Sequence, residues 1–306
     1  MWKLLFLPVA FLAACSNPPS EPATPEAEVA EATEATEAEP AVAAAKSLVT
    51  LGGNITETVY ALGEGAKVVG VDASSMYPPE ATEQEQVGYY RQVSAEGIIS
   101  LSPELVIASD ATGPAEALEK VTGVGIPVEI VSAEKTLEGA LTRIRAISKI
   151  LNHEAKGQEI IQTIESQLKE VQAPEVKPKV LFIYARGAGS LNVAGTKTAA
   201  DEMIRLAGGE NAVQEYEGYK PINSESIVAA APDAILLTKG GLESMGGAEA
   251  VKALQGVSLT PAAKADRILS MDDLLLLGMG PRTGEAVKTL ADLLHTPVAT
   301  ADAAEQ

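Results

Sequence analysis

The sequence predicts an α/β protein with two Rossmann-like lobes, each with a central sheet, joined by one long backbone helix. A repeated motif predicts the lobes, since residues 94–99 with 103–107 have the same layout as residues 223–228 with 232–236. Each copy has a polar cap, a glutamate in the first helical turn, an apolar helix face, a proline and an apolar strand. Apolar residues at helical spacing over 136–171 predict the helix, either continuous or as two helices in line.

Composition limits the function classes. The chain of 306 residues is long enough for one large or two medium domains. Its formal net charge of −19 argues against nucleic acid as a partner, because such proteins carry basic patches.

The N-terminus has the features of an export signal. Lys3 precedes an apolar run from Leu4 to Ala14, which is too short for a stable membrane-spanning helix. The run ends in Leu-Ala-Ala-Cys, which resembles a bacterial lipobox, so we predict a lipoprotein signal peptide at 1–14 and lipid on Cys15. The alternative is a cysteine in a leader that is cut elsewhere. Cys15 is the only cysteine, so no disulfide can form within the chain.

The domain organisation follows from composition and periodicity. After Cys15, residues 15–46 are rich in Pro, Ala, Thr and Glu and should form a disordered acidic linker. We expect an N-terminal α/β lobe at 47–135, the connecting helix at 136–173, a C-terminal α/β lobe at 174–296 and a disordered tail at 297–306. Strands are predicted at 48–51, 67–72, 105–108, 128–131, 179–184, 234–237 and 268–270.

The sequence lacks the residues that several kinds of functional site require. His153 and His295, the only histidines, are both expected on the solvated surface, so a serine triad has no base. No cluster of histidines and carboxylates suits a bare metal ion. Residues 278–280 lack the third glycine of a dinucleotide fingerprint, and the glycine loop at 186–190 lacks the Lys-Ser/Thr of a phosphate loop. Paired acids for general acid-base catalysis stay open as an alternative, but no motif points to them, and we do not expect an enzyme.

Tyrosine, arginine and lysine side chains near strand ends remain as candidates for ligand binding. Tyr89, Tyr90 and Arg91 precede the first repeat helix, and Tyr219 precedes the second. Three further cations are expected in glycine-bearing loops: Arg186, Lys239 and Arg282. A tyrosine phenolate is one of the few protein ligands for haem iron, a nearby arginine favours phenolate over phenol, and basic loops suit carboxylates. The alternative is that Tyr89 and Tyr90 merely pack a loop.

From residue 47 to residue 295 the chain resembles the class III substrate-binding proteins of bacterial ABC importers, and among them the hemin-binding (HmuT-type) proteins. The matching stretches are 88–97, 198–201, 204–209, 217–221, 241–247 and 277–282. The resemblance implies that Tyr89 is the axial ligand of haem iron, and that Glu96 and Glu225 dock on arginines of the permease. One departure is Gly240, where such proteins often carry arginine, and neither histidine fits a second iron ligand.

Together these observations predict a monomeric haem-binding lipoprotein of the cell envelope, facing the periplasm or the cell exterior. It would bind haem without catalysis and hand it to an ABC permease and its ATPase, with the lipid as its membrane attachment. The alternative within the same class is a ferric-siderophore or cobalamin-binding protein. A periplasmic enzyme or an adhesin is a more distant alternative, because the chain lacks a catalytic base and repeats beyond two.

Overall fold

The computed structural model describes residues 45–172, 174–187 and 191–296. The predicted signal peptide, Cys15, most of the acidic linker and the C-terminal tail lie outside these residues. No helix in the described ranges is long and apolar enough to cross a membrane.

The first lobe is built on a five-stranded parallel sheet in the order β3-β2-β1-β6-β7. Its strands are β1 (Leu48–Leu51), β2 (Val68–Val71), β3 (Glu85–Gln86), β6 (Leu105–Ser109) and β7 (Val128–Val131). Its helices are α1 (Gly53–Ala61), α2 (Ala95–Ser100), α3 (Ala115–Gly123) and the short 3-10 turns η2 (Gly65–Lys67) and η3 (Pro79–Glu83). Strand β1 is buried on both faces because Leu48 packs toward α1 and Val49 toward α2 and α3.

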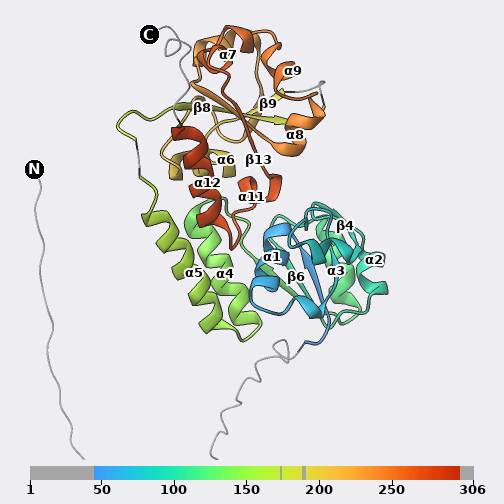
Figure 1. Cartoon of the computed structure of the whole chain (residues 1–306). Helices are drawn as coiled ribbons and strands as arrows, with labels where there is room; N and C mark the ends of the chain where they lie inside the picture. The colour runs from blue at the N-terminus through green and yellow to red at the C-terminus, as the bar shows by residue number, and fades with distance from the viewer. Residues whose placement is uncertain (1–44, 173, 188–190, 297–306) are drawn as a thin grey trace, which may run out of the picture. The chain divides into compact units, whose positions relative to one another are not determined.

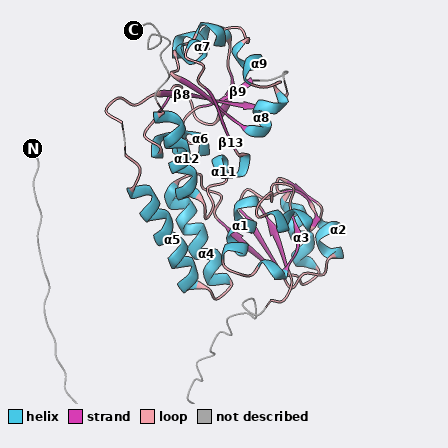
Figure 2. Ribbon diagram, in the orientation of Figure 1, coloured by secondary structure: helices cyan, strands magenta, loops and turns pink. Residues whose placement is uncertain are grey.

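The second lobe has a six-stranded mixed sheet in the order β11-β9-β8-β12-β13, with β10 also paired to β8. Its strands are β8 (Lys179–Ala185), β9 (Leu191–Ala194), β10 (Glu210–Asn211), β11 (Tyr219–Pro221), β12 (Ala234–Thr238) and β13 (Ile268–Met271). Strands β8, β10, β12 and β13 are parallel, whereas β9 and β11 run antiparallel to their neighbours. In both lobes helices lie on either side of the strands (Figure 2).

The helices of the second lobe cover the two faces of this sheet. They are α6 (Ala199–Leu206), α7 (Ser224–Ala230), α8 (Lys239–Ser244), α9 (Ala248–Lys252), the 3-10 turn η4 (Val257–Leu259), α10 (Pro261–Lys264), α11 (Asp273–Leu277) and α12 (Thr283–His295). Phe182 on β8 points into the core shared with α6, α11 and α12. Leu181, its neighbour in the strand, points into the core shared with α7, α9 and α10. The predicted strands and repeat are therefore confirmed in both lobes.

The predicted single connecting helix is wrong. Residues 137–169 form an antiparallel hairpin of α4 (Leu137–Ile150) and α5 (Glu154–Lys169), seen side by side in Figure 1. The chain reverses at Asn152, which has a left-handed conformation with φ of 56°. The N–H of His153 then donates to the carbonyl of Ser148 at 2.7 Å. Asparagine tolerates this conformation, so the turn needed neither glycine nor proline.

The hairpin packs tightly because of one small residue. A Cβ atom on Gly157 of α5 would lie 2.5 Å from the Cβ of Ser148 on α4, closer than two carbon atoms can approach. The absence of a side chain lets the helices approach, and four apolar residues fill their interface: Leu141, Ile144, Ile161 and Ile164. The apolar period that suggested one helix therefore marks two helices facing each other.

The helical hairpin contributes to the cores of both lobes. Ile147 and Leu151 at the end of α4 belong to the core of the first lobe, whereas Ala140 near its start belongs to that of the second. Helix α5 lies along α12 (Figure 1), where a Cβ on Gly284 would lie 2.8 Å from the Cβ of Gln167. The hairpin is therefore part of the folded body and not an exposed connector.

A second link between the lobes is the segment 278–282, which joins α11 to α12. Its carbonyls accept hydrogen bonds from the first lobe and from α4: Asn54 Nδ2 donates to Gly278 at 2.7 Å, and Arg143 Nη2 donates to Met279 at 2.7 Å. Arg282 Nε donates to Glu57 Oε1 of α1 at 2.8 Å. These bonds tie the start of α12 to the start of α1.

Candidate ligand-binding site

Tyr89 lies on a small hairpin formed by β4 (Gly88–Tyr89) and β5 (Gln92–Val93). The hairpin needs glycine at position 88, because φ is 106° there and a Cβ would lie 2.7 Å from the carbonyl oxygen of Gln92. The N–H of Gly113 donates to the carbonyl of Tyr90 at 2.9 Å, which places the hairpin beside the loop after β6. The sequence predicted the tyrosines but not this hairpin.

Asp72 holds three loops together under the hairpin, a role that sequence reasoning missed. Its fully buried carboxylate accepts the N–H of Gly52 at 2.8 Å, of Ser74 at 2.9 Å and of Tyr90 at 3.0 Å. These donors come from the loop after β1, the loop after β2 and the hairpin. An acidic residue directly after an apolar strand was the available signal, because a buried carboxylate needs hydrogen-bond donors.

The two adjacent tyrosines have different environments. Their ring centroids are 4.6 Å apart with the planes inclined at 60°. Arg91 donates through Nε to the hydroxyl of Tyr90 at 3.0 Å, and its guanidinium lies 5.4 Å from the centre of that ring. Arg91 therefore binds Tyr90 directly, and Tyr89, which is 37% exposed, presents its side chain to the site.

Without a ligand, the surroundings of Tyr89 favour the neutral phenol. Desolvation and then Tyr90 raise the pKa of Tyr89, and the opposite effects of Arg91 and Arg186 are smaller. The arginine effects have the expected sign, but loss of solvation exceeds them.

The second lobe presents aromatic and basic groups to the same site. The ring of Tyr219 on β11 lies 5.5 Å from that of Tyr184 on β8, and Arg186 lies 5.4 Å from the centre of the Tyr184 ring. Interaction with Tyr184 and, to a smaller extent, with Tyr89 raises the pKa of Arg186. Arg186 and Tyr89 therefore face each other, although they come from different lobes.

Tyr219 is only partly accessible. Its side chain is 42% exposed, yet desolvation raises the pKa of its hydroxyl to about 12. The two observations agree if the polar end is the part that faces the protein, where Tyr184 and Tyr90 also raise its pKa. Tyr219 thus offers ring surface to a ligand while its hydroxyl stays protonated.

A cavity of about 380 Å³ lies beside Arg186, within the range typical of ligand sites. Its lining comes from the ends of β8 and β12 and from α8 and α11: Tyr184, Ala185, Arg186, Thr238, Gly240, Gly241, Ser244 and Asp273. Open α/β sheets place ligands at these carboxyl ends of their strands. The part of the glycine loop at 188–190 lies outside the described residues.

Lys239 lies next to this cavity, but the prediction that it belongs to a loop is wrong. Lys239 is the first residue of helix α8, whose N-cap is Thr238, with Oγ1 accepting the N–H of Gly241 at 3.0 Å. The N–H of Gly240 donates to Asp273 at 2.9 Å, so the two glycines that suggested a loop instead bring the backbone close to α11. The Lys239 side chain is exposed at the rim.

Arg282 is engaged in the link between the lobes. Its guanidinium pairs with Glu57, which is 4% exposed, and stacks 3.5 Å from the ring centre of Tyr77. Desolvation raises the pKa of Glu57 despite the arginine, whereas the hydrogen bond and charge of Glu57 raise the pKa of Arg282 against its own desolvation. Contact of Arg282 with a ligand stays a prediction.

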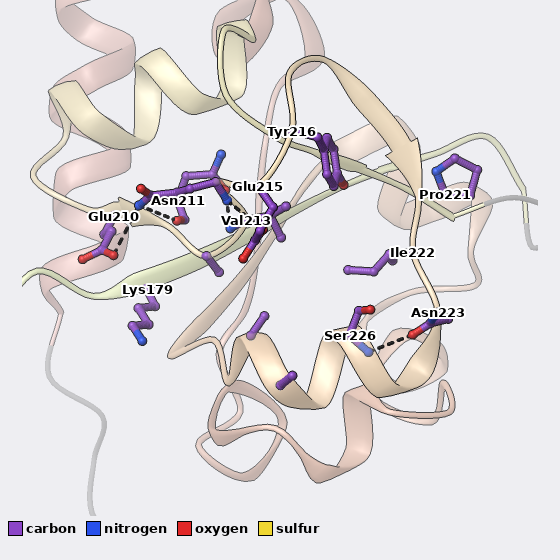
Figure 3. A pocket seen from close by; sticks show the side chains of 14 residues that line it. Lys179, Glu210, Asn211, Val213, Glu215, Tyr216, Pro221, Ile222, Asn223 and Ser226 are labelled. Carbon is purple, nitrogen blue, oxygen red and sulfur yellow. Dashed lines mark hydrogen bonds between the residues drawn. The ribbon is translucent and has the colours of Figure 1, made fainter.

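A larger hollow of about 720 Å³ lies elsewhere on the second lobe (Figure 3). It is bordered by Lys179 at the beginning of β8, by residues 210–216 and by α7, which includes Ser226. Arg186 follows the other end of β8, so this hollow is separate from the site of Tyr89 and Arg186. None of the predicted ligand-binding residues lines it.

The two repeat glutamates, Glu96 and Glu225, lie in the first turns of α2 and α7 and are exposed. Other residues cap these helices: Ser94 accepts the N–H of Gly97 at 3.0 Å, and Asn223 accepts that of Ser226 at 2.8 Å. Backbone hydrogen bonding and then Lys120, at 3.5 Å, lower the pKa of Glu96. Both side chains point into solvent, so they are free to meet a partner.

The histidines differ from the expected solvated residues. His153 Nε2 lies 2.6 Å from Glu64 Oε1, and Nε2 of His295 is buried without a hydrogen-bond partner among the described residues. Within the described ranges, no group of three His, Cys, Asp or Glu residues could hold a metal ion. Tyrosine therefore remains the candidate iron ligand.

Comparison with known proteins agrees with this architecture. The periplasmic heme-binding protein RhuT from Roseiflexus sp. RS-1, in its apo form, is 40% identical, with a TM-score of 0.79 over 81% of this chain and 97% of that one. The uncharacterized ABC transporter substrate-binding lipoprotein YvrC of Bacillus subtilis is 30% identical over 96% of both chains. The vitamin B12-binding protein of Vibrio parahaemolyticus is 28% identical over 78% of this chain and 86% of its own.

The periplasmic binding protein family model matches residues 48–275, which span both sheets and the helical hairpin between them. The two-lobed fold agrees with this match. The alignment with the Bacillus relative, which covers 96% of both chains, agrees with it as well. The chain belongs to the periplasmic binding protein family.

Proposed function

We propose that this protein binds haem outside the cytoplasm and delivers it to the permease of an ABC importer. The observation that carries the proposal is Tyr89, a half-exposed phenol on a glycine-dependent hairpin that faces Arg186 of the other lobe. Similarity to the heme-binding protein RhuT supports the same ligand. The protein acts by binding alone, and the haem leaves chemically unchanged.

The side chains divide the binding task by their chemistry. Tyr89 coordinates the ferric iron through its phenolate oxygen, and its phenol proton leaves when the iron binds. Arg91 holds the ring of Tyr90 next to Tyr89, at 3.0 Å from the Tyr90 hydroxyl. Arg186 and Lys239 attract the carboxylates, and Tyr219 packs its ring against the macrocycle. Arg282 lies at the junction of the lobes and would contribute to ligand binding through its contact with Tyr77.

The contact with Arg91 makes Tyr90 a poorer ligand than Tyr89. The Tyr90 hydroxyl already accepts a hydrogen bond from Arg91, and its coordination would break that bond. The raised pKa of Tyr89 means that a strong Lewis acid is needed to remove its proton, which favours a ferric centre over weaker cations.

Paired tyrosine variants test the proposed iron ligand. Tyr89→Phe keeps the ring and removes the oxygen, so the visible charge-transfer band of tyrosinate-bound ferric haem should disappear. Affinity for hemin should fall by roughly a hundredfold, about the loss expected for a strong charge-assisted contact. The measurement is a hemin titration followed by absorption spectroscopy.

Tyr90→Phe is the matched control, since it removes an equivalent oxygen one residue away. It should keep the charge-transfer band and lose affinity by less than about tenfold. Identical spectra for wild type and both variants would contradict Tyr89 as the ligand. Failure of wild-type protein to bind hemin at all would contradict the proposed function.

A second candidate function is cobalamin binding, which the similarity to the Vibrio vitamin B12-binding protein favours. A corrin already holds its metal through its own ring nitrogens, so Tyr89 would not be required. Titration with cyanocobalamin, alongside hemin, separates the two: the proposed haem function requires tighter binding of hemin and dependence on Tyr89.

We further propose that the protein is a monomer anchored by lipid on Cys15, which lies outside the described residues. The resemblance of residues 12–15 to a lipobox and the similarity to the lipoprotein YvrC support the anchor. The acidic segment 16–46 would then tether the binding lobes to the membrane. Glu96 and Glu225 would contact arginines of the permease, which its ATPase drives.

A further inference from the structure

Lys135 is a cation near the ligand edge that sequence reasoning did not single out. It lies in the segment 132–136, which leads from β7 to α4. The N–H of Asp110 donates to the carbonyl of Val131 at 3.0 Å, and the N–H of Ala133 donates to the Asp110 carboxylate at 2.9 Å. These bonds hold the segment of Lys135 next to the carboxyl end of β6.

Positive charge surrounds Lys135. Arg143 of α4 and Arg91 of the tyrosine hairpin both lower its pKa, and Asp110 is the one acid that acts in the opposite direction. Arg143 is 1% exposed, and its guanidinium donates at 2.7 Å to the carbonyls of Ser132 and Met279. Three cations are therefore gathered near one carboxylate, in a chain whose formal net charge is −19.

Lys135 makes no hydrogen bond or ion pair with another described residue. Its side chain is partly buried, and desolvation is the largest cause that lowers its pKa, to about 8. A partly desolvated ammonium without an anionic partner is unfavourable, so an incoming anion would gain more here than at an exposed lysine. The surroundings of Lys135 therefore suit a carboxylate from outside the protein.

Lys135 also lies near the hairpin that carries the tyrosines. Arg91, one of its neighbours, belongs to the hairpin that carries Tyr89, and this hairpin is bonded to the loop after β6 through Gly113. The carboxyl ends of β6 and β7 and the hairpin thus form one edge of the sheet. A ligand held by Tyr89 would extend across this edge.

We propose that Lys135, together with Arg91, binds a carboxylate of the ligand whose iron is held by Tyr89. This inference rests on the proposed function and identifies the basic group of the first lobe that recognises the acid side of the ligand. The second lobe supplies Arg186 and Lys239 for the other carboxylate. The protein would therefore select a metalloporphyrin that carries free acids.

The test compares hemin with hemin dimethyl ester, whose acids are neutral, on three variants. Lys135→Met keeps the length of the side chain without its charge, and Lys135→Arg keeps a charge. Lys156→Met on α5 is the control, because it removes an equal charge from a surface lysine that pairs with Glu159 at 3.0 Å. Each protein is titrated with both compounds, and its thermal melting is recorded.

Lys135→Met should bind hemin roughly 10- to 100-fold more weakly than wild type, the loss expected for one charge-assisted hydrogen bond. Its tyrosinate charge-transfer band should stay unchanged, and its affinity for the dimethyl ester should equal that of wild type. Lys135→Arg should recover most of the hemin affinity, and Lys156→Met should bind both compounds like wild type.

Two results would overturn the inference. One is equal hemin affinity in wild type and Lys135→Met. The other is an equal loss for hemin and its dimethyl ester, since the lysine would then act on the shape of the site and not on the acid. If wild-type protein binds neither compound, the proposed haem function fails, and that outcome is distinct from both.

Discussion

Tyr89 and Tyr90 are adjacent residues of the same type, and only their contacts with neighbouring residues distinguish them. The hydroxyl of Tyr90 is held by Arg91 at 3.0 Å, and its N–H donates to the buried carboxylate of Asp72. Tyr90 therefore anchors the hairpin, and Tyr89 is the tyrosine that we propose as the iron ligand. A single arginine and a single aspartate, both in the first lobe, produce this difference.

The lowered pKa of Lys135 predicts that hemin affinity depends on pH. The ammonium of the free protein loses its proton near pH 8, and a bound carboxylate should raise that pKa. At this residue the complex then holds more protons than the free protein above about pH 8, so the hemin affinity of wild type should fall relative to that of Lys135→Arg as pH rises through this range. The measurement is the hemin dissociation constant from about pH 7 to about pH 9.5.

Lys135→Arg is the reference for this dependence, because a guanidinium stays charged throughout the range. Proton release from Tyr89 on iron binding acts in the opposite direction and is common to both proteins. Arg91, Arg143 and Asp110, which face Lys135, also remain in both. Parallel pH profiles of wild type and Lys135→Arg would show that Lys135 does not bind a carboxylate of hemin.

At the scale of elements, the α4–α5 hairpin depends on how closely two helices can approach. Gly157 of α5 lies where any side chain would overlap Ser148 of α4. The apolar residues that join the two helices are buried on the facing sides, so any separation exposes them. The packing at Gly157 therefore affects the whole connection between the lobes.

Gly157→Ala should destabilise the protein by roughly 1–3 kcal/mol, because its new Cβ would lie 2.5 Å from the Cβ of Ser148 and must push the helices apart. The free energy of unfolding from urea denaturation measures the effect. This direction is opposite to the usual effect of replacing glycine by alanine within a helix.

Gly123→Ala on α3 is the matched control, since no atom lies within 4 Å of the Cβ it would add. It should leave stability unchanged or raise it by up to about 1 kcal/mol through helix propensity. If Gly157→Ala proves as stable as Gly123→Ala, the helices can separate without cost and the close approach is unimportant.

At the scale of the whole molecule, each lobe contributes one half of two separate surfaces. Tyr89 from the first lobe and Arg186 from the second face each other at the ligand site. Glu96 and Glu225 occupy matching positions in α2 and α7, one in each lobe. The repeat accounts for the matching positions of the two glutamates, and the proposed ligand contacts also come from both lobes.

Glu96→Ala combined with Glu225→Ala should weaken docking to the permease while leaving hemin affinity nearly unchanged. Loss of one partner from a desolvated charge pair typically costs 2–5 kcal/mol, which corresponds to at least a tenfold loss of binding. Stability should change little, because Ser94 and Asn223 provide the helix caps. The measurement is haem uptake by permease in reconstituted vesicles.

The control for docking replaces two exposed glutamates of α5, Glu159→Ala with Glu165→Ala, which change the net charge equally. This variant should support normal uptake. Normal uptake by the Glu96 and Glu225 variant would refute the docking role. A large fall in its melting temperature would instead assign these glutamates to helix stability.

The sequence alone determined the strands, the repeat and the types of the binding residues. Apolar runs such as 105–108 and 179–184 can only be buried strands in this setting, and cap residues such as Ser94 and Asn223 act within a few residues of their own position. These signals depend on neighbouring residues in the sequence, so they can be interpreted without knowledge of the fold. The choice of Tyr89 over Tyr90 instead came from the resemblance to hemin-binding proteins.

Only the tertiary structure decided how distant groups meet. The helical hairpin was missed because an apolar period describes one face of a helix and does not say what covers it. The pairing of Arg282 with Glu57, the approach of Arg186 to Tyr89 and the charge around Lys135 each join residues far apart in the chain. Electrostatic interactions and desolvation depend on distance in space, and that distance is set by packing.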